Sequence, residues 1–215
     1  MSTPPAPRRA RLMQARSRET RRRLVRAALR LWSERGFETG IEETTAEEIA
    51  QAAGVTKGTF YFHFAHKEEI LLEMGYETAS ILSEEAARCI KAGRGLEESL
   101  RMLMNALARS IKAADPAAVV RALAEFRRPR RPDTEVPAPG PAFAEAFEVL
   151  FERAQKEGEV TDQVEPAEMA QIIEALALDT VLEWATGRQS RLNVALHRRT
   201  AIVLAGLRPD SSLSL

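Results

Sequence analysis

Residues 45–64 restrict the fold of this chain more than any other segment. Thr45 is followed three residues later by Glu48, the capping-box spacing in which a hydroxyl and a carboxylate satisfy free amides at a helix start. Gly54 suits the left-handed conformation that often ends a helix, and Thr56 is the N-cap of a second helix. The segment therefore predicts two short helices joined by a glycine turn.

The side chains of this segment divide into a packed face and an outward face. Phe60 and Phe64 are four residues apart, so both are expected to point into the core. The spacing leaves two interpretations open: a helix-turn-helix whose second helix enters the major groove of DNA, or an ordinary helical hairpin in a bundle. The outward face of the second helix carries Lys57, Thr59, Tyr61 and His63.

Charge is distributed unevenly, although 31 basic and 31 acidic side chains cancel overall. Residues 8–35 hold eleven arginines against Glu19 and Glu34, a local net charge of 11 − 2 = +9. This asymmetry is typical of a segment that meets phosphate, but a solvated helix face with a disordered tail has the same composition. The arginine-rich, acid-free start is also typical of an organelle transit peptide, and that alternative stays open.

Composition favours a cytoplasmic protein. A chain of 215 residues with 45% hydrophobic side chains can bury a core on its own. The single cysteine, Cys89, excludes an intramolecular disulfide. No stretch approaches the roughly 20 apolar residues that span a bilayer, so no membrane segment is expected.

Apolar residues recur at intervals of three and four, and strand signals are nearly absent, so the chain is predicted to be all-α. We expect a disordered basic arm over 1–16, a three-helix helix-turn-helix domain over 17–66, and a larger helical domain over 67–215. Five prolines among residues 127–141 predict an extended, mobile loop. The predicted helices cover 17–35, two short stretches within 45–64, 67–91, 96–114, 116–128, 141–157, 166–186 and 192–207.

The pattern AxxAGVTKGTFYFHF, followed by a helix start at Lys67, Glu68 and Glu69, resembles the DNA-binding domain of the TetR family of bacterial regulators. The resemblance covers about residues 20–74 and implies a transcription regulator with double-stranded DNA as its partner. By matching position, it implies that bases are faced by Lys57, Gly58 and Thr59, and that phosphates are held by Thr45, Thr56, Tyr61, His63 and Lys67.

Two positions depart from the family pattern. Ala65 and His66 stand where proline, glycine, serine or asparagine is frequent, which weakens the cap of the following helix. Glu47 stands where a base-contacting arginine can occur, and its carboxylate would accept a hydrogen bond from cytosine or repel phosphate. Arginines of the N-terminal arm would either enter the adjacent minor groove or only solubilise the chain.

A helix-turn-helix reads few base pairs, so we expect a homodimer on a palindromic operator. Residues 166–186 are apolar on two sides and would pair with the last helix, which carries Val194, Leu196, Ala201, Val203 and Leu204. The alternative is a fully buried central helix. The candidate interface residues are Ile172, Leu176, Leu178, Val181, Leu182 and Val203.

The resemblance also implies that helices within about residues 67–157 enclose a pocket for a small apolar or amphipathic molecule. Methionine and aromatic side chains adapt to apolar ligands, although the same pattern is common in an ordinary core. The ligand is expected to favour the form that does not fit DNA, which makes the protein a repressor released by an inducer. The candidate ligand residues are Met74, Met102, Met104, Phe126, Phe143, Phe147 and Phe151.

Other classes of function have weaker support. Cys89 is alone on an amphipathic helix and His197 is the only histidine beyond residue 66, so no nucleophile with a base can be assigned and no enzyme is predicted. The spacing of His63, His66 and the following glutamates matches no standard zinc pattern, and no cofactor is predicted. A lipid-binding first helix is the remaining alternative, but its apolar stripe is expected to pack inside the domain.

Overall fold

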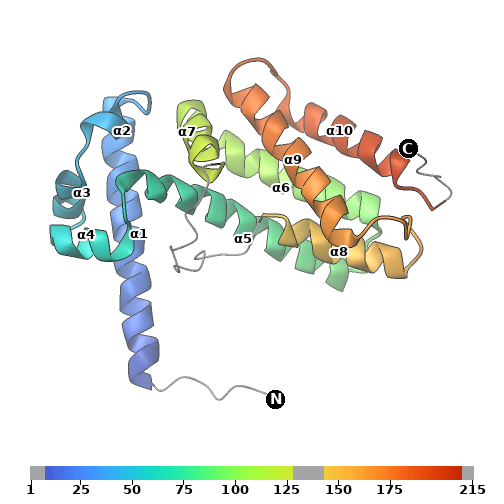
Figure 1. Ribbon diagram of the computed structural model, residues 1–215, viewed down its shortest axis with the longest axis horizontal. Coiled ribbons are helices and arrows are strands. Elements are labelled where there is room, and N and C mark those ends of the chain that lie inside the picture. Colours follow the sequence, from blue (N-terminus) through green and yellow to red (C-terminus); the bar gives the residue numbers. More distant parts are fainter. Residues whose placement is uncertain (1–7, 128–142, 210–215) are drawn as a thin grey trace. The chain divides into compact units, whose positions relative to one another are not determined.

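Every regular element in residues 8–127 and 143–209, the part of the chain that the computed structural model describes, is helical, which confirms the predicted all-α class (Figure 1). Residues 1–7, 128–142 and 210–215 lie outside this part. The chain divides into two compact units, Met1–Glu73 and Met74–Leu215. None of the helices in the described part is long and apolar enough to cross a membrane.

The first unit is a small helical domain built on one long helix. Its core consists of fully buried side chains, with Leu24 and Trp32 from the first helix, Ile49 from the third, and Phe60 from the fourth. In order, its elements are α1 (Arg8–Arg35), α2 (Gly40–Glu43), α3 (Ala46–Ala52), α4 (Lys57–His63), η1 (Lys67–Glu69), and the first turn of α5 (Ile70–Lys91), which continues into the second unit.

Helix α1 is longer than the sequence analysis predicted. It begins at Arg8 rather than near residue 17, so residues 8–16 are helical and only residues 1–7 of the predicted disordered arm remain outside the described part. The segment RRARLMQAR consists of residue types with high helix propensity, which accounts for the earlier start. The predicted start near residue 17 therefore missed the first nine residues of the helix.

Two further differences concern helix α2 and the boundary between the two units. Helix α2, with only four residues, was not predicted because it is much shorter than the window of roughly 11–18 residues in which a helical period can be recognised. Its first residue, Gly40, lies so close to α1 that a Cβ atom there would be 2.9 Å from the Cβ of Arg35 and 3.0 Å from the carbonyl oxygen of Trp32. The compact units divide after Glu73 rather than after residue 66, because η1 and the first turn of α5 pack with the first unit.

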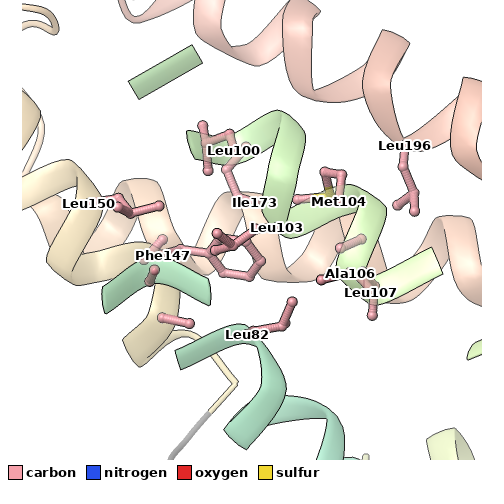
Figure 2. Close-up of a cluster of buried hydrophobic side chains, with 14 of the residues drawn as sticks. Leu82, Leu100, Leu103, Met104, Ala106, Leu107, Phe147, Leu150, Ile173 and Leu196 are labelled. Atoms are coloured by element: carbon pink, nitrogen blue, oxygen red, sulfur yellow. The ribbon is translucent and has the colours of Figure 1, made fainter. Parts of the chain in front are cut away.

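The second unit is a helical bundle in which α9 (Pro166–Ala185) is central. Helix α9 contacts α7 (Pro116–Phe126), α8 (Glu145–Lys156) and α10 (Leu192–Gly206), while α6 (Leu96–Lys112) contacts α8 and α10. Figure 2 shows Phe147 directed into the same apolar cluster as Leu103 and Ile173. Helices α7 and α9 begin at the predicted residues 116 and 166, and each of these is a proline. Helix α8 begins at Glu145, and its predicted start at residue 141 lies outside the described residues.

Candidate functional site

The N-terminus of α3 is fixed by the predicted capping box. The Oγ1 of Thr45 accepts a hydrogen bond from the amide of Glu48 at 3.1 Å, and Oε2 of Glu48 accepts from the amide of Thr45 at 2.7 Å. Arg35 reaches the same carboxylate from α1, with Nη2 at 2.6 Å from Oε1. The hydrogen bond from Arg35, followed by those from Thr45, lowers the pKa of Glu48 to about 2. The start of α3 is therefore held by a carboxylate that stays ionised at neutral pH.

The turn from α3 to α4 has the geometry of a helix-turn-helix. Gly54 has a φ of +66°, in the left-handed region that glycine adopts without strain, and Val55 donates to the carbonyl of Ala50 at 2.9 Å. Thr56 caps α4 by accepting from the amide of Thr59 at 3.1 Å. Gly54 and Thr56 were both predicted for this turn, and every bond in it joins residues within five positions, so α4 is placed by local interactions.

Helix α4 has one buried face and one free face. Phe60 and Phe64 are 0% and 1% exposed, as their spacing predicts, and their ring centroids lie 5.8 Å apart. On the opposite side Tyr61 is 52% exposed, and Lys57 is also exposed. Phe62 is 79% exposed, and the sequence analysis missed it although the spacing that buries its neighbours already sends it outward.

Gly58 lies on α4 without a structural reason for being glycine. A Cβ atom at this position would meet only Oγ1 of Thr56, at the ordinary contact distance of 3.8 Å, and the φ of Gly58 is not positive. Gly54, two residues before the cap, differs because its φ requires glycine. The absence of a side chain at Gly58 leaves the backbone of α4 open to a molecule approaching from outside.

Lys57 and Glu47 form an ion pair on the outward surface, with Nζ 3.2 Å from Oε2. The side chains are 55% and 72% exposed, so the pair contributes little to folding and each group remains available to a ligand. Glu47 on α3 is thereby placed beside the first residue of α4. A donor and an acceptor of hydrogen bonds lie next to each other on this surface.

Two of the predicted phosphate-binding residues also have partners inside the unit. Nζ of Lys67 donates to the carbonyl of Glu42 at 2.9 Å and to the carbonyl of Thr44 at 2.8 Å, which leaves one of its three N–H groups for another partner. His63 is partly buried, and burial, followed by the charge of Arg21, lowers the pKa of its imidazole. His63 is therefore neutral at physiological pH.

Arg21 joins three elements of the first unit and was not identified from the sequence. Its Nη1 donates to the carbonyl of His63 at 2.6 Å, and its Nε and Nη2 donate to Oε1 of Glu73 at 2.9 and 2.7 Å. Its Cζ lies 4.2 Å from the ring centroid of Phe64. Arg21 thus ties the end of α4 to α5, and no local pattern indicates a pairing across 52 residues.

The described residues hold no group of three or more His, Cys, Asp or Glu side chains that could bind a metal ion. His66 has its Nδ1 3.3 Å from Glu68 and its Nε2 3.7 Å from Glu69. Cys89 is buried, and burial raises the pKa of its thiol, so the thiolate required of a nucleophile is disfavoured.

The candidate ligand residues fall in different environments within the second unit. Phe147, Phe151 and Met104 are completely buried in the core cluster, and Phe143 is 8% exposed. Met102 is half-buried against this cluster, with its Sδ 3.8 Å from the Sγ of Cys89. Met74 is half-buried at the start of the unit, whereas Phe126 is 40% exposed at the end of α7. One core therefore includes, or is directly packed by, five of the candidates: Met102, Met104, Phe143, Phe147 and Phe151. Met74 and Phe126 do not belong to it.

The candidate dimer residues lie on α9 and α10 but differ in exposure. Ile172 is 43% exposed, and the half-buried group consists of Leu176, Leu178, Leu182 and Val203. Val181 is 1% exposed and Leu196 is 0% exposed, so both belong to the core of the second unit and present no surface to a second copy of the chain. Ile202, missed by the sequence analysis, is 67% exposed, and Val194 is 58% exposed.

The sequence matches two families of transcriptional regulators. Residues 24–74 match the family described as bacterial regulatory proteins, tetR family, and residues 97–209 match the SbtR-like transcriptional regulator, C-terminal domain. The HTH-type transcriptional regulator AcrR of Shigella flexneri is 37% identical over 75 residues, 35% of this chain and 33% of that protein. The A-factor receptor protein of Streptomyces griseus is 28% identical over 180 residues, 81% of this chain and 59% of that protein.

A solved structure with a similar fold is that of Thermus thermophilus FadR, a TetR-family transcriptional repressor in complex with lauroyl-CoA. It is 26% identical, with a TM-score of 0.71, and the match covers 91% of this chain and 98% of that one. In contrast, the first curated relatives are matched over a third or less of their own length. The sequence similarity to these relatives is thus confined to a short region.

Proposed function

Because the chain belongs to the TetR family of bacterial transcriptional regulators, we propose that it is a repressor that binds a palindromic operator as a homodimer and leaves it when a small molecule binds. The observation that carries the proposal is the outward face of α4. This face exposes Lys57 and Tyr61 around Gly58, a glycine that nothing within the protein requires.

In the proposed complex, α4 lies in the major groove. Lys57, Gly58 and Thr59 face the base edges, because the N-terminal residues of a recognition helix meet bases. The neighbouring caps and the residues further along α4 meet the backbone, which positions the helix. The phosphate-contacting residues are Thr45, Thr56, Tyr61 and His63, together with Lys67 through its one remaining N–H group.

The pair of Lys57 and Glu47 favours a G·C base pair at the centre of this contact. Guanine offers two acceptors in the major groove, N7 and O6, and cytosine offers the N4 amino donor. An ammonium and a carboxylate that are 3.2 Å apart match this arrangement of acceptors and donor. We therefore assign Glu47 to base recognition, together with Lys57.

The proposed dimer forms through α9 and α10. Ile172 on α9 and Val194 and Ile202 on α10 expose apolar side chains, and two copies of this helix pair would cover them in a four-helix interface. Leu176, Leu178, Leu182 and Val203 are half-buried on the same two helices and would complete the contact. Two copies would place two recognition helices on one palindromic site.

The proposed inducer is a small apolar or amphipathic molecule bound in the second unit. The FadR of Thermus thermophilus, which is similar in fold, was solved with lauroyl-CoA, a ligand with a long apolar chain. Met102, Met104 and Phe147 provide adaptable apolar surface around one core. To act as an inducer, the ligand must bind the DNA-incompatible form more tightly, by about 1–3 kcal/mol or more.

Selection of bound fragments from a library of random duplex DNA tests the central claim. We expect the purified chain to enrich one palindromic sequence, and the variants Lys57→Gln and Tyr61→Ala to bind it much more weakly. Arg109→Gln, an exposed residue of α6, serves as a control that removes one positive charge elsewhere. Failure of the wild-type chain to enrich any sequence would contradict the proposed function.

A further inference from the structure

A hollow of about 460 Å³ lies beside α1 in the first unit, and no residue of α4 lines it. Arg23, Arg26 and Arg30 line it from α1, and Gln51 and Gly54 line it from the end of α3 and the turn that follows. Among the described residues that form its wall, three carry guanidinium groups and none carries a carboxylate. Its chemistry therefore suits an anion.

Arg23 forms the fixed part of this wall. Its Nη2 donates to the carbonyl of Ala53 and, at 3.3 Å, to the carbonyl of Gly54. These carbonyls lie at the C-terminal end of α3, where the helix dipole is negative and would repel an anion. Arg23 offsets this partial charge, and it has further N–H groups with which to meet a ligand.

Arg26 and Arg30 form the adaptable part of the wall. Arg26 pairs with Glu19 at 3.0 Å, and Arg30 pairs with Glu34 at 3.9 Å, outside the hollow. All four side chains are more than half exposed, and exposed ion pairs contribute at most about 1 kcal/mol. Each arginine can therefore leave its glutamate partner, at little cost in free energy, and bind a phosphate group through two parallel hydrogen bonds.

The hollow adjoins the start of the recognition helix. Gly54 precedes Lys57 by three residues, so their Cα atoms lie no more than about 11 Å apart. The major groove is about 12 Å wide and a helix with its side chains is about 10–12 Å across, so a phosphate strand borders each side of an inserted helix. Residues that adjoin the N-terminal end of α4 are therefore within reach of one of these strands.

We propose that this arginine hollow, lined by Arg23, Arg26, Arg30 and Gln51, holds backbone phosphates of DNA that flank the bases read by α4. The inference rests on the proposed DNA-binding function and extends the contact surface to α1. These contacts are independent of sequence, because phosphates carry no base identity. They raise affinity for the operator and for unrelated DNA by the same factor, and they set the register of the domain on the duplex.

Salt dependence of binding tests the inference. The variant Arg26→Gln/Arg30→Gln is compared with Arg18→Gln/Arg22→Gln, which removes the same charge from exposed positions of α1 outside the hollow. We expect the slope of log affinity against log salt to fall by about two for the first variant and by much less for the second. Affinity for an operator duplex and for an unrelated duplex should fall equally, while the preferred sequence stays the same.

Two other results for the slopes overturn the assignment. An unchanged slope in the first variant means that the hollow holds no phosphate, and an equal fall in both variants means that the charge of α1 acts diffusely. Circular dichroism melts of both variants exclude unfolding as the cause. If the wild-type chain selects no operator, the proposed function fails, but the slopes on an unrelated duplex still test the hollow. A chain that binds no duplex contradicts both proposals.

Discussion

Arg21 and Glu73 are joined by two hydrogen bonds, because Nε and Nη2 of the guanidinium both donate to Oε1 of the carboxylate at 2.9 and 2.7 Å. The two side chains are only 21% and 19% exposed. Glu73 is the last residue of the first compact unit, and it belongs to α5, which continues into the second. The pair, with the bond from Arg21 to the carbonyl of His63, fixes the end of the recognition helix to α5.

Replacing Arg21 by alanine should destabilise the first unit. The change leaves the carbonyl of His63 and the carboxylate of Glu73 with unmet hydrogen bonds in a half-buried site, which costs about 1–3 kcal/mol of unfolding free energy. Urea denaturation measures the loss. Arg22→Ala is the matched control, since Arg22 is exposed on the same helix and should change stability by less than about 0.5 kcal/mol. Equal effects of the two changes would contradict this role of Arg21.

Gly58→Ala should separate folding from DNA binding. The added methyl group meets only Thr56 and replaces a helical glycine, so stability should rise by about 0.5–1 kcal/mol while operator affinity falls. Gly54→Ala is the contrast, because its φ of +66° strains any residue with a Cβ atom and stability should fall. Thermal melts and anisotropy titrations measure the two quantities. Full operator affinity in Gly58→Ala would show that DNA does not approach this glycine.

Glu47→Ala should change which base pair is preferred. Without the carboxylate, Lys57 loses its 3.2 Å partner and cytosine loses its proposed acceptor. We expect relaxed selection at one position of each half-site and higher affinity for unrelated DNA, because a negative charge near phosphate is removed. Sequencing of selected duplexes from wild-type and variant chains measures this. An identical base preference in both would remove Glu47 from the recognition set.

Glu48 should give the protein an acid-sensitive capping box. Its pKa in the folded state is about 2, below the ordinary value of 4.5, so the ionised carboxylate stabilises the folded state. The contribution is complete above about pH 4.5 and is lost as the pH falls toward 2. Melting temperatures should therefore differ between wild type and Glu48→Gln at pH 6, and the difference should shrink as the pH falls below 4.5 and disappear only near pH 2. A difference that does not vary with pH would show that the charge of Glu48 is irrelevant to stability.

Ile202→Glu should weaken the proposed dimer. Ile202 is 67% exposed in one subunit, so the change should not disturb the fold of that subunit, but a carboxylate in an apolar interface lacks a partner. Light scattering should show a shift from dimer to monomer as the protein is diluted. Val149→Glu, at a residue of α8 that is 42% exposed, is the control. A monomeric wild type, or a variant that stays dimeric, would place the interface elsewhere.

Much of the fold and of the recognition segment could be predicted from sequence because the relevant interactions are local. The caps at Thr45 and Thr56 involve residues three positions away. Burial of Phe60 and Phe64 follows from the helical period, and the same period indicates the exposure of Phe62. The predicted start of α1, near residue 17, was wrong, because residues 8–16 have high helix propensity and continue the helix back to Arg8.

The sequence by itself determined the all-helical fold, the two caps, the glycine turn and the outward row of α4, because each depends on neighbours within one or two helical turns. Only the tertiary structure decided which side of α9 and α10 is free, with Val181 buried and Ile202 exposed, and which groups meet Arg21 and line the arginine hollow. These contacts join residues that are far apart in the chain, and no local period records which of them will meet.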